Sequence, residues 1–450
     1  MGIWNTIIDG LIRRDDQHID KTRIIKGIIH SLVIQGISVV LVFVGNLLIA
    51  RWAGADAYGN YVHIFNWISI LSIMALGGMG DVAIARIPKY LANDQPGRVY
   101  SFARKSNRFI LLSSIGIAIL FLLIIYLLPL KTLHENRTEF LLASAGIYGM
   151  TFLSLNQNIL QSLNYISQSQ WVEKWIKPGL LALFFIAARW WLYRSDSRIL
   201  VIIAVLIMGI CCLVLFQLLW RKIKIYRLDT RSYLEENLRR KMSYFFSIDV
   251  LNLLSTKITM LILPYFSLQR EVGIFNVSYR IADLVIYPFF LMNTVMPQLF
   301  SKHFGSELSH KQFLYSEATK LMTLISIPIL LINIAAGKFF LGWFGKDFVE
   351  GYMALVQLSV AQFLFSLFGP AHIILTMMNK EKYATLALLI YVIVLLAGNL
   401  ILVPVFGING GTMGVIIGSL TYNGVLAFMA YRSCGVGSPY LLFLRDSLRK

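Results

Sequence analysis

Long apolar segments recur along the whole chain, and they constrain its fold more than any other feature. Each segment is roughly 18–28 residues long, and about 20 apolar residues in a helix cross the ~30 Å hydrocarbon core of a bilayer. The expected spans are 25–50, 59–85, 108–130, 139–163, 177–193, 198–220, 244–268, 271–300, 318–337, 352–378, 383–404 and 408–431. The segments are too long for membrane β-strands and do not alternate in polarity. The sequence therefore predicts an all-α integral membrane protein of about 12 transmembrane helices.

Composition excludes most soluble classes of protein. Hydrophobic residues make up 57% of the 450 residues and charged residues 14%, whereas soluble domains carry about 25% charged residues. The three cysteines, Cys211, Cys212 and Cys434, form no CxxC pair, so we expect neither a disulfide framework nor a metal site. The motifs HExxH, P-loop and GxSxG are absent as well. We therefore expect neither a cofactor nor an enzymatic activity.

The net charge of +18 is distributed over separate short loops, so it does not form the single basic face that nucleic acid requires. If the N-terminus is inside, roughly 30 Lys and Arg residues fall in inner loops and about 9 in outer loops. Lys174 and Lys177 are counted with the inner loop that precedes 177–193. This contrast predicts an even number of spans with both termini in the cytoplasm.

The chain contains a weak internal repeat. Gly59 near the start of the second span and Gly273 near the start of the eighth are 214 residues apart. Asn164 at the end of the fourth span and Asn379 at the end of the tenth are 215 residues apart. Two regions with nearly the same offset indicate two six-helix bundles that form a parallel repeat.

The expected organisation has five parts. Near the N-terminus, Ile3, Trp4, Ile7 and neighbouring apolar residues share one helical face, which is typical of a helix lying on the inner membrane surface. The parts are an N-terminal cytoplasmic segment, a first six-helix bundle, a basic cytoplasmic linker, a second six-helix bundle and a cytoplasmic tail, at 1–24, 25–220, 221–243, 244–431 and 432–450.

Several short motifs carry a resemblance to a known family. They are residues 47–61 (LLIARWAGADAYGNY), 77–86 (GGMGDVAIAR), 272–280 (VGIFNVSYR), 348–352 (FVEGY) and the Gly369-Pro370 pair. The chain resembles polysaccharide biosynthesis flippases, the O-antigen (Wzx-type) branch of the multidrug/oligosaccharidyl-lipid/polysaccharide (MOP) superfamily. That superfamily also holds the multidrug and toxin extrusion (MATE) proteins and the flippase of the peptidoglycan precursor. A MATE-like arrangement of the two bundles is thus implied.

The resemblance also implies a function in lipopolysaccharide biosynthesis. It implies an oligosaccharide on undecaprenyl diphosphate, moved from the inner to the outer leaflet of the bacterial cytoplasmic (inner) membrane by alternating access, coupled to an ion gradient. Membrane lipids are the implied surroundings, and a polysaccharide polymerase and a chain-length regulator are the implied partners.

Charged residues inside spans are the first candidates for a site, because charge in the hydrocarbon is costly unless it has a role. Lys257 and Arg280 lie ~16 and ~14 Å from the outer ends of spans seven and eight at 1.5 Å per residue. Two cations at one depth suit a diphosphate. Alternatively, Arg280 with Asp283, or Lys257 with Asp249, could form structural ion pairs. Asp283 and Asp249 are also candidates for proton coupling.

Amide side chains are candidates for binding sugar, because an amide can both donate and accept hydrogen bonds. Gln157, Gln161 and Asn164 follow one another at i, i+4 and i+7 along span four, which places them on one helical face. Asn46 in span one and Asn66 in span two are similar. Such amides also bind membrane helices to one another, and this alternative stays open.

Three other functions compete with a flippase. A multidrug cation exporter on the same fold would favour an acidic cavity without Lys257 and Arg280. A membrane-bound polysaccharide polymerase would need reactive residues in a large outer loop, and the expected outer loops are all short. A purely structural partner of the assembly machinery would tolerate the loss of both cations.

Overall fold

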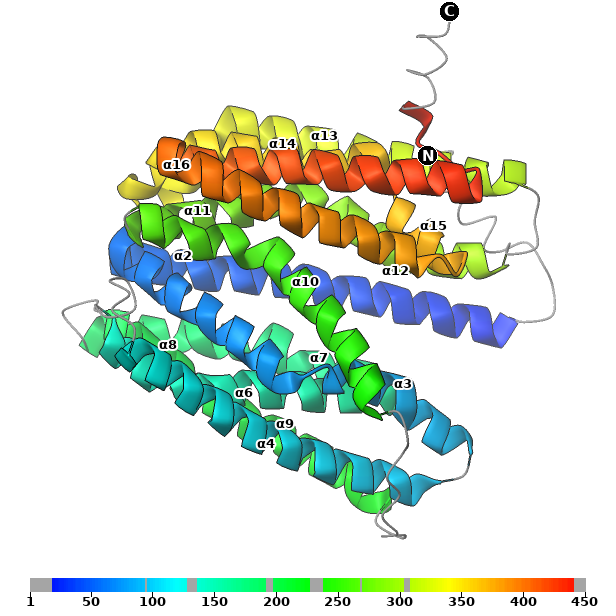
Figure 1. Ribbon diagram of the computed structural model, residues 1–450, viewed down its shortest axis with the longest axis horizontal. Coiled ribbons are helices and arrows are strands. Elements are labelled where there is room, and N and C mark those ends of the chain that lie inside the picture. The colour runs from blue at the N-terminus through cyan, green and yellow to red at the C-terminus, as the bar shows by residue number, and fades with distance from the viewer. Residues whose placement is uncertain are drawn as a thin grey trace, which may run out of the picture.

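The computed structural model describes residues 18–93, 95–127, 136–191, 197–226, 238–267, 269–302 and 308–440. Within these ranges the chain forms helices and the turns between them, and no strand. The expected interfacial helix in 1–24 lies mostly outside the described residues, as does the end of the tail. Figure 1 shows α3 to α9 gathered on one side of the bundle and α11 to α16 on the other, with α10 crossing between them.

The helices of the first half of the chain follow one another with short breaks. They are α2 (His18–Leu76), α3 (Met79–Ala92), α4 (Pro96–Leu127), α6 (Arg137–Ser162), α7 (Ile166–Trp171), η1 (Val172–Ile176), α8 (Lys177–Trp191), α9 (Ser197–Ile223) and η2 (Lys224–Tyr226).

The second half is built in the same way. Its elements are α10 (Leu238–Phe266), α11 (Gln269–Ala282), η3 (Asp283–Ile286), α12 (Tyr287–Lys302), α13 (Leu308–Phe344), η4 (Lys346–Gly351), α14 (Tyr352–Phe368), α15 (Ala371–Met377) and α16 (Glu381–Cys434).

The expected number of spans is confirmed. Nine helices of the described residues are long and apolar enough to cross a membrane. Two of them, α2 and α16, each consist of two helices joined at a kink, at Gly54 (φ 77°) and Gly407 (φ 55°). Positive φ favours glycine, which lacks a Cβ atom. The segment α7–η1–α8 adds a further continuous helix from Ile166 to Trp191, so the described chain contains twelve spans.

The fifth span begins earlier than the expected 177–193. The helix starts at Ile166 and passes through a π-helical turn, Val172–Ile176, before α8. Polar residues in its first turns lower the local hydropathy, which hid its start from the sequence pattern. Lys174 and Lys177 consequently lie inside this helix, and the assignment of both to an inner loop is wrong.

The two halves share local structure at the positions that the repeat pairs. Asn164 and Asn379 are the two residues other than glycine with positive φ in the described chain, at 66° and 55°. In each case the residue after the asparagine donates its backbone N–H to the carbonyl five residues back, Tyr165 to Leu160 and Lys380 to Leu375. Both helices therefore end in the same left-handed cap, as a parallel repeat predicts.

The two halves approach most closely where α2 meets α11. Gly59 and Gly273, the other pair matched by the repeat, face each other there: a Cβ atom on Gly273 would lie 2.6 Å from the carbonyl oxygen of Ala55 and 3.1 Å from the backbone nitrogen of Gly59. A Cβ atom on Gly59 would overlap the carbonyl of Gln269. Small residues allow membrane helices to pack backbone against backbone, so this contact depends on both glycines.

Candidate functional site

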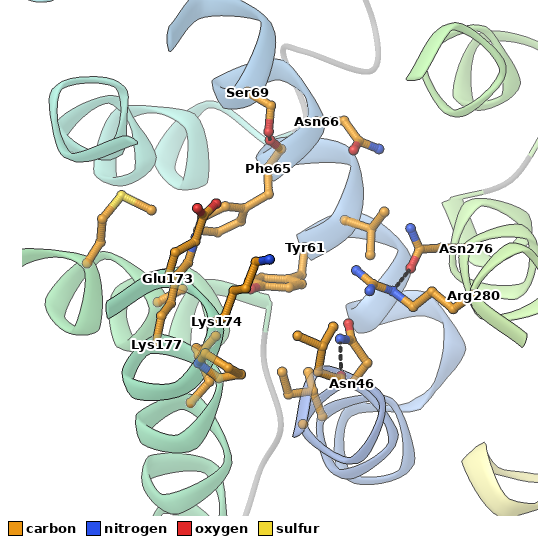
Figure 2. Close-up of a pocket in the computed structure, with 18 of the residues that line it drawn as sticks. Asn46, Tyr61, Phe65, Asn66, Ser69, Glu173, Lys174, Lys177, Asn276 and Arg280 are labelled. Atoms are coloured by element: carbon orange, nitrogen blue, oxygen red, sulfur yellow. Dashed lines mark hydrogen bonds between the residues drawn. The ribbon is translucent and has the colours of Figure 1, made fainter. Parts of the chain in front are cut away.

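A cavity of about 430 Å³ lies between the two halves of the bundle. The helices α2, α8 and α9 of the first half and α10 and α11 of the second half contribute to its wall. Figure 2 shows Glu173 and Lys174 reaching into it from one side and Asn276 and Arg280 from the other, with α2 between them. The cavity is therefore enclosed by elements that are far apart in the sequence.

Arg280 is held in the cavity wall by a neutral partner. Its Nε donates a hydrogen bond to Oδ1 of Asn276, one helical turn earlier, at 2.9 Å. The buried Tyr58 hydroxyl of α2 reaches the same Oδ1 at 3.0 Å and Oδ1 of Asn46 at 2.9 Å. The Tyr58 hydroxyl also interacts with Arg280 itself. These contacts orient the guanidinium, whose forked geometry suits the binding of a phosphate.

Lys257 of α10 lines the same cavity as Arg280. Lys257 lies nine residues before the end of α10 and Arg280 eleven after the start of α11, which is ~14 and ~17 Å along the helices. The structure thus brings together the two cations that the sequence placed at one depth.

Within the described residues, neither of the two alternative ion pairs forms. Arg280 is not paired with Asp283, and Lys257 is not paired with Asp249. Oδ1 of Asp283 accepts a hydrogen bond from Nε2 of Gln362 in α14 at 2.7 Å. Neither aspartate lines the cavity.

The opposite wall carries charged residues that the sequence pattern missed. Glu173, Lys174 and Lys177, from η1 and the start of α8, all line the cavity. Lys174 and Lys177 are three residues apart and so share a helical face. The charged lining of the described chain thus comprises four cations and one carboxylate, and it is positive overall. A π-helical turn is often found at functional sites.

The amides of the first two spans also lie where the sequence suggested. Asn46 and the buried Asn66 both line the cavity. Nδ2 of Asn66 lies 3.4 Å from Sδ of Met260 on α10. The rings of Tyr61 and Phe65 line the wall beside them, with centroids 4.7 Å apart. This part of the cavity offers hydrogen-bonding amides next to aromatic faces.

The polar stripe of α6 does not reach the cavity. Gln157 is half-buried and Gln161 is exposed, and Asn164 forms the left-handed cap of α6. None of the three lines the cavity. On the same helix, Asn156 exchanges two hydrogen bonds with Asn107 of α4, at 2.9 and 3.0 Å. The structure shows this neighbouring amide binding one helix to another, as membrane helices commonly do.

Comparison with known proteins identifies the family. The sequence profile described as "Polysaccharide biosynthesis protein" matches residues 24–303, more than half of the chain. No individual curated protein matches significantly.

Solved structures of transporters share the fold. An inward-facing multidrug resistance MATE family transporter of the MOP superfamily superposes with a TM-score of 0.74 at 15% identity, over 90% of this chain and 98% of that chain. The lipid II flippase MurJ, in an inward closed conformation, gives 0.67 at 13% identity, over 93% and 90%. A MOP superfamily transporter from Pyrococcus furiosus, described as having a binding pocket of reverse polarity, gives 0.62 at 16% identity, over 89% and 95%.

The family profile and the solved structures both point to the MOP superfamily. At these identities the solved structures establish the fold alone. The chain belongs to the polysaccharide biosynthesis protein family, and it has the MATE-like fold of MOP superfamily transporters and flippases.

Proposed function

We propose that this protein is a flippase for an oligosaccharide carried on undecaprenyl diphosphate, of the O-antigen kind. It moves this lipid from the inner to the outer leaflet of the bacterial inner membrane by alternating access, coupled to an ion, and supplies a polymerase and a chain-length regulator. The observation that carries the proposal is the cavity between the halves, whose lining includes Lys257 and Arg280, neither of which makes a direct ion pair among the described residues.

The chemistry of such a substrate explains why the cavity must be positive. A diphosphate cannot enter hydrocarbon without a large desolvation cost. Arg280 offers a guanidinium and Lys257 an ammonium, and hydrogen bonds between charged groups are roughly twice as strong as neutral ones. Asn46 and Asn66 offer amides to sugar hydroxyls. The polyprenyl tail remains in the surrounding lipid.

The competing functions fit the cavity less well. A cavity with a net positive lining repels cationic drugs, so it does not suit a multidrug cation exporter. A polymerase would need a reaction centre, whereas the polar groups described here form a lining for binding. A structural role would not require four cations around one cavity, because cations are costly inside a membrane protein.

The test is a flipping assay in proteoliposomes with a lipid-linked oligosaccharide. The variants Lys257→Ala and Arg280→Ala should each lower the flipping rate by roughly 10- to 150-fold, because each removes charge-assisted hydrogen bonds of about 1.5–3 kcal/mol. Lys257→Arg should keep more activity than Lys257→Ala. Lys382→Ala, an exposed lysine at the start of α16, serves as the matched control and should leave the rate unchanged.

Each variant must first be shown to insert and to remain folded, by its yield and thermal unfolding. Full flipping by both alanine variants would contradict the proposal. Ion coupling is tested in the same vesicles with and without a pH gradient, in the wild type and in Asp283→Asn and Asp249→Asn. Equal rates with and without the gradient would remove the proton from the proposal.

A further inference from the structure

A second cavity, of about 350 Å³, lies within the first half of the chain, between α4, α6 and α9. Its wall is largely aromatic, formed by Tyr148, Phe152, Phe216 and Trp220. The rings of Phe216 and Trp220 are stacked, with centroids 5.7 Å apart. These two side chains are 47% and 45% exposed, so the cavity opens on the outside of the bundle, away from the space between the halves.

One end of this cavity is cationic. Arg104 and Arg108 both line it, and both are exposed. They are four residues apart on α4 and so share a helical face. No acidic residue lines the cavity, and neither arginine has an ion-pair partner in the part of the chain that the structure describes. Two guanidinium groups are thus available at the mouth.

The position of the cavity along α4 places its mouth at the membrane surface. The 32 residues of α4 extend ~48 Å at 1.5 Å per residue, whereas the hydrocarbon core is ~30 Å thick. Arg104 and Arg108 lie in the first half of α4, before the apolar stretch that begins at Phe109. At the same end of the bundle, Trp220 lies close to the end of α9, and tryptophan prefers the boundary between headgroups and acyl chains.

Beyond the arginines, the outside of the bundle faces lipid. Leu112 on α4 is 62% exposed and Leu213 on α9 is 65% exposed. A ligand that fills the cavity therefore meets cations at headgroup depth and apolar rings at acyl-chain depth. Basic pockets between membrane helices bind anionic lipid headgroups in this way.

We propose that this cavity is a binding site for an anionic phospholipid. The phosphate contacts Arg104 and Arg108, and one acyl chain lies along the Phe216 and Trp220 rings. The Asn107–Asn156 amide pair fixes α4 against α6 beside it. The site is separate from the cavity between the halves, so it does not depend on the proposed flipping function.

The experiment uses the full chain in nanodiscs and measures quenching of tryptophan fluorescence by lipids with brominated acyl chains. Brominated phosphatidylglycerol is compared with brominated phosphatidylcholine, and the signal of Trp220 is isolated by subtracting the variant Trp220→Phe. We expect phosphatidylglycerol to be preferred roughly 5- to 30-fold at this tryptophan, the effect of two cations near the surface.

The double variant Arg104→Gln/Arg108→Gln should abolish the preference. The matched control is Lys382→Gln/Arg432→Gln, which removes two exposed cations from α16 and should keep it. Equal quenching by the two lipids, or a preference that survives the double variant, would overturn the proposal. So would loss of the preference in the control, which would indicate surface charge alone. Displacement by a small proportion of undecaprenyl phosphate would assign the site to that lipid instead.

Discussion

Arg280 illustrates how a membrane protein can keep a positive charge available for a ligand. A carboxylate partner would neutralise the guanidinium, and the pair would then be a structural element. Asn276 instead accepts one hydrogen bond from Nε and adds no charge. Tyr58 reaches Asn276 from α2, so the first half of the chain holds the residue that orients the arginine of the second half.

This arrangement makes a residue-scale prediction for Asn276. The variant Asn276→Asp should form an ion pair with Arg280, neutralise it, and lower flipping at least ~10-fold, a loss of ~1.4 kcal/mol. Asn66→Asp, which adds the same charge elsewhere on the cavity wall, should lower flipping less. The measurement is the flipping rate at equal amounts of folded protein, and equal losses in the two variants would show that the Asn276–Arg280 contact has no special role.

At this scale the sequence predicted part of the cavity lining. Lys257, Arg280, Asn46 and Asn66 line the cavity as expected, because a polar side chain in an apolar span is costly unless it faces water or a partner. The same reasoning does not distinguish a polar side chain that faces a water-filled cavity from one that binds a neighbouring helix. The amides of α6 satisfied the pattern equally well, yet the helix that carries them packs its Asn156 against α4.

Lys174 and Lys177 were missed for a different reason. Hydropathy locates the apolar part of a helix, and the helix that carries these lysines begins eleven residues before that part. A helix that lines a polar cavity carries polar residues where it faces that cavity. The polar residues that line the cavity therefore also lower the hydropathy of the first turns, and the hydropathy pattern misses the start of the helix.

At the scale of elements, the contact of α2 with α11 joins the two halves of the chain, and both helices also line the cavity. The two backbones meet at Gly59 and Gly273 without room for a Cβ atom. A transporter that alternates access must separate such a contact and form it again. A glycine pair is suited to this, because backbone surfaces can part without disentangling side chains.

The contact predicts that Gly273→Ala will impair flipping. Its Cβ atom would lie 2.6 Å from the Ala55 carbonyl oxygen, so α2 and α11 must move apart, at a cost of about 1–3 kcal/mol typical of overpacking. The melting temperature should be lower than that of the wild type, and the flipping rate should fall at least several-fold. The control Gly209→Ala has no atom within 4 Å of its new Cβ and should behave as wild type. A wild-type rate in Gly273→Ala would show that flipping does not depend on the close approach of α2 and α11.

A second contact between elements joins α3 to α10. There the carboxyl groups of Asp81 and Asp249 form a hydrogen bond with each other, which requires that one of them carries a proton. Burial raises the pKa of Asp81 above its usual range. Both groups ionise as the pH increases, and two negative charges then oppose the contact.

The sign of the pH dependence follows from the raised pKa of Asp81. A raised pKa favours the protonated form in the folded protein, so stability should fall as pH rises through that pKa. We expect the melting temperature of the wild type to decrease as the pH rises through the raised pKa of Asp81. Asp249→Asn should flatten this decrease, and Glu317→Gln, in an exposed pair with Lys320, should not. An unchanged slope in Asp249→Asn would mean that the two carboxyls do not share a proton.

The elements themselves were largely predictable. Twelve apolar segments gave twelve spans, because the bilayer thickness sets the length of any helix that crosses it. The pattern did not predict that spans one and two, and spans eleven and twelve, continue into each other through Gly54 and Gly407. A kink at one glycine leaves the hydropathy of both flanking helices unchanged, so it leaves no trace in that pattern.

At the scale of the whole molecule, two similar halves enclose a cavity that is chemically asymmetric. The shared caps at Asn164 and Asn379 and the glycine contact reflect the repeat. At the offset of 214 residues Arg280 corresponds to Asn66, so the cation of one half has an amide as its counterpart in the other. A duplicated scaffold thus presents a cation and an amide at corresponding positions of one cavity, which suits the diphosphate and the sugar of the proposed substrate.

The orientation of the bundle in the membrane is a prediction at this same scale. Basic residues concentrate in the loops on one side, and positively charged loops remain in the cytoplasm. A reporter inserted in the 131–138 loop should therefore be active only outside, and one in the 221–243 loop only inside, with both termini inside as well. Orientation decides in which leaflet the proposed lipid site at Arg104 and Arg108 lies and from which side the proposed substrate enters. A cytoplasmic 131–138 loop would invert the whole bundle, and the direction of flipping would then have to be assigned anew.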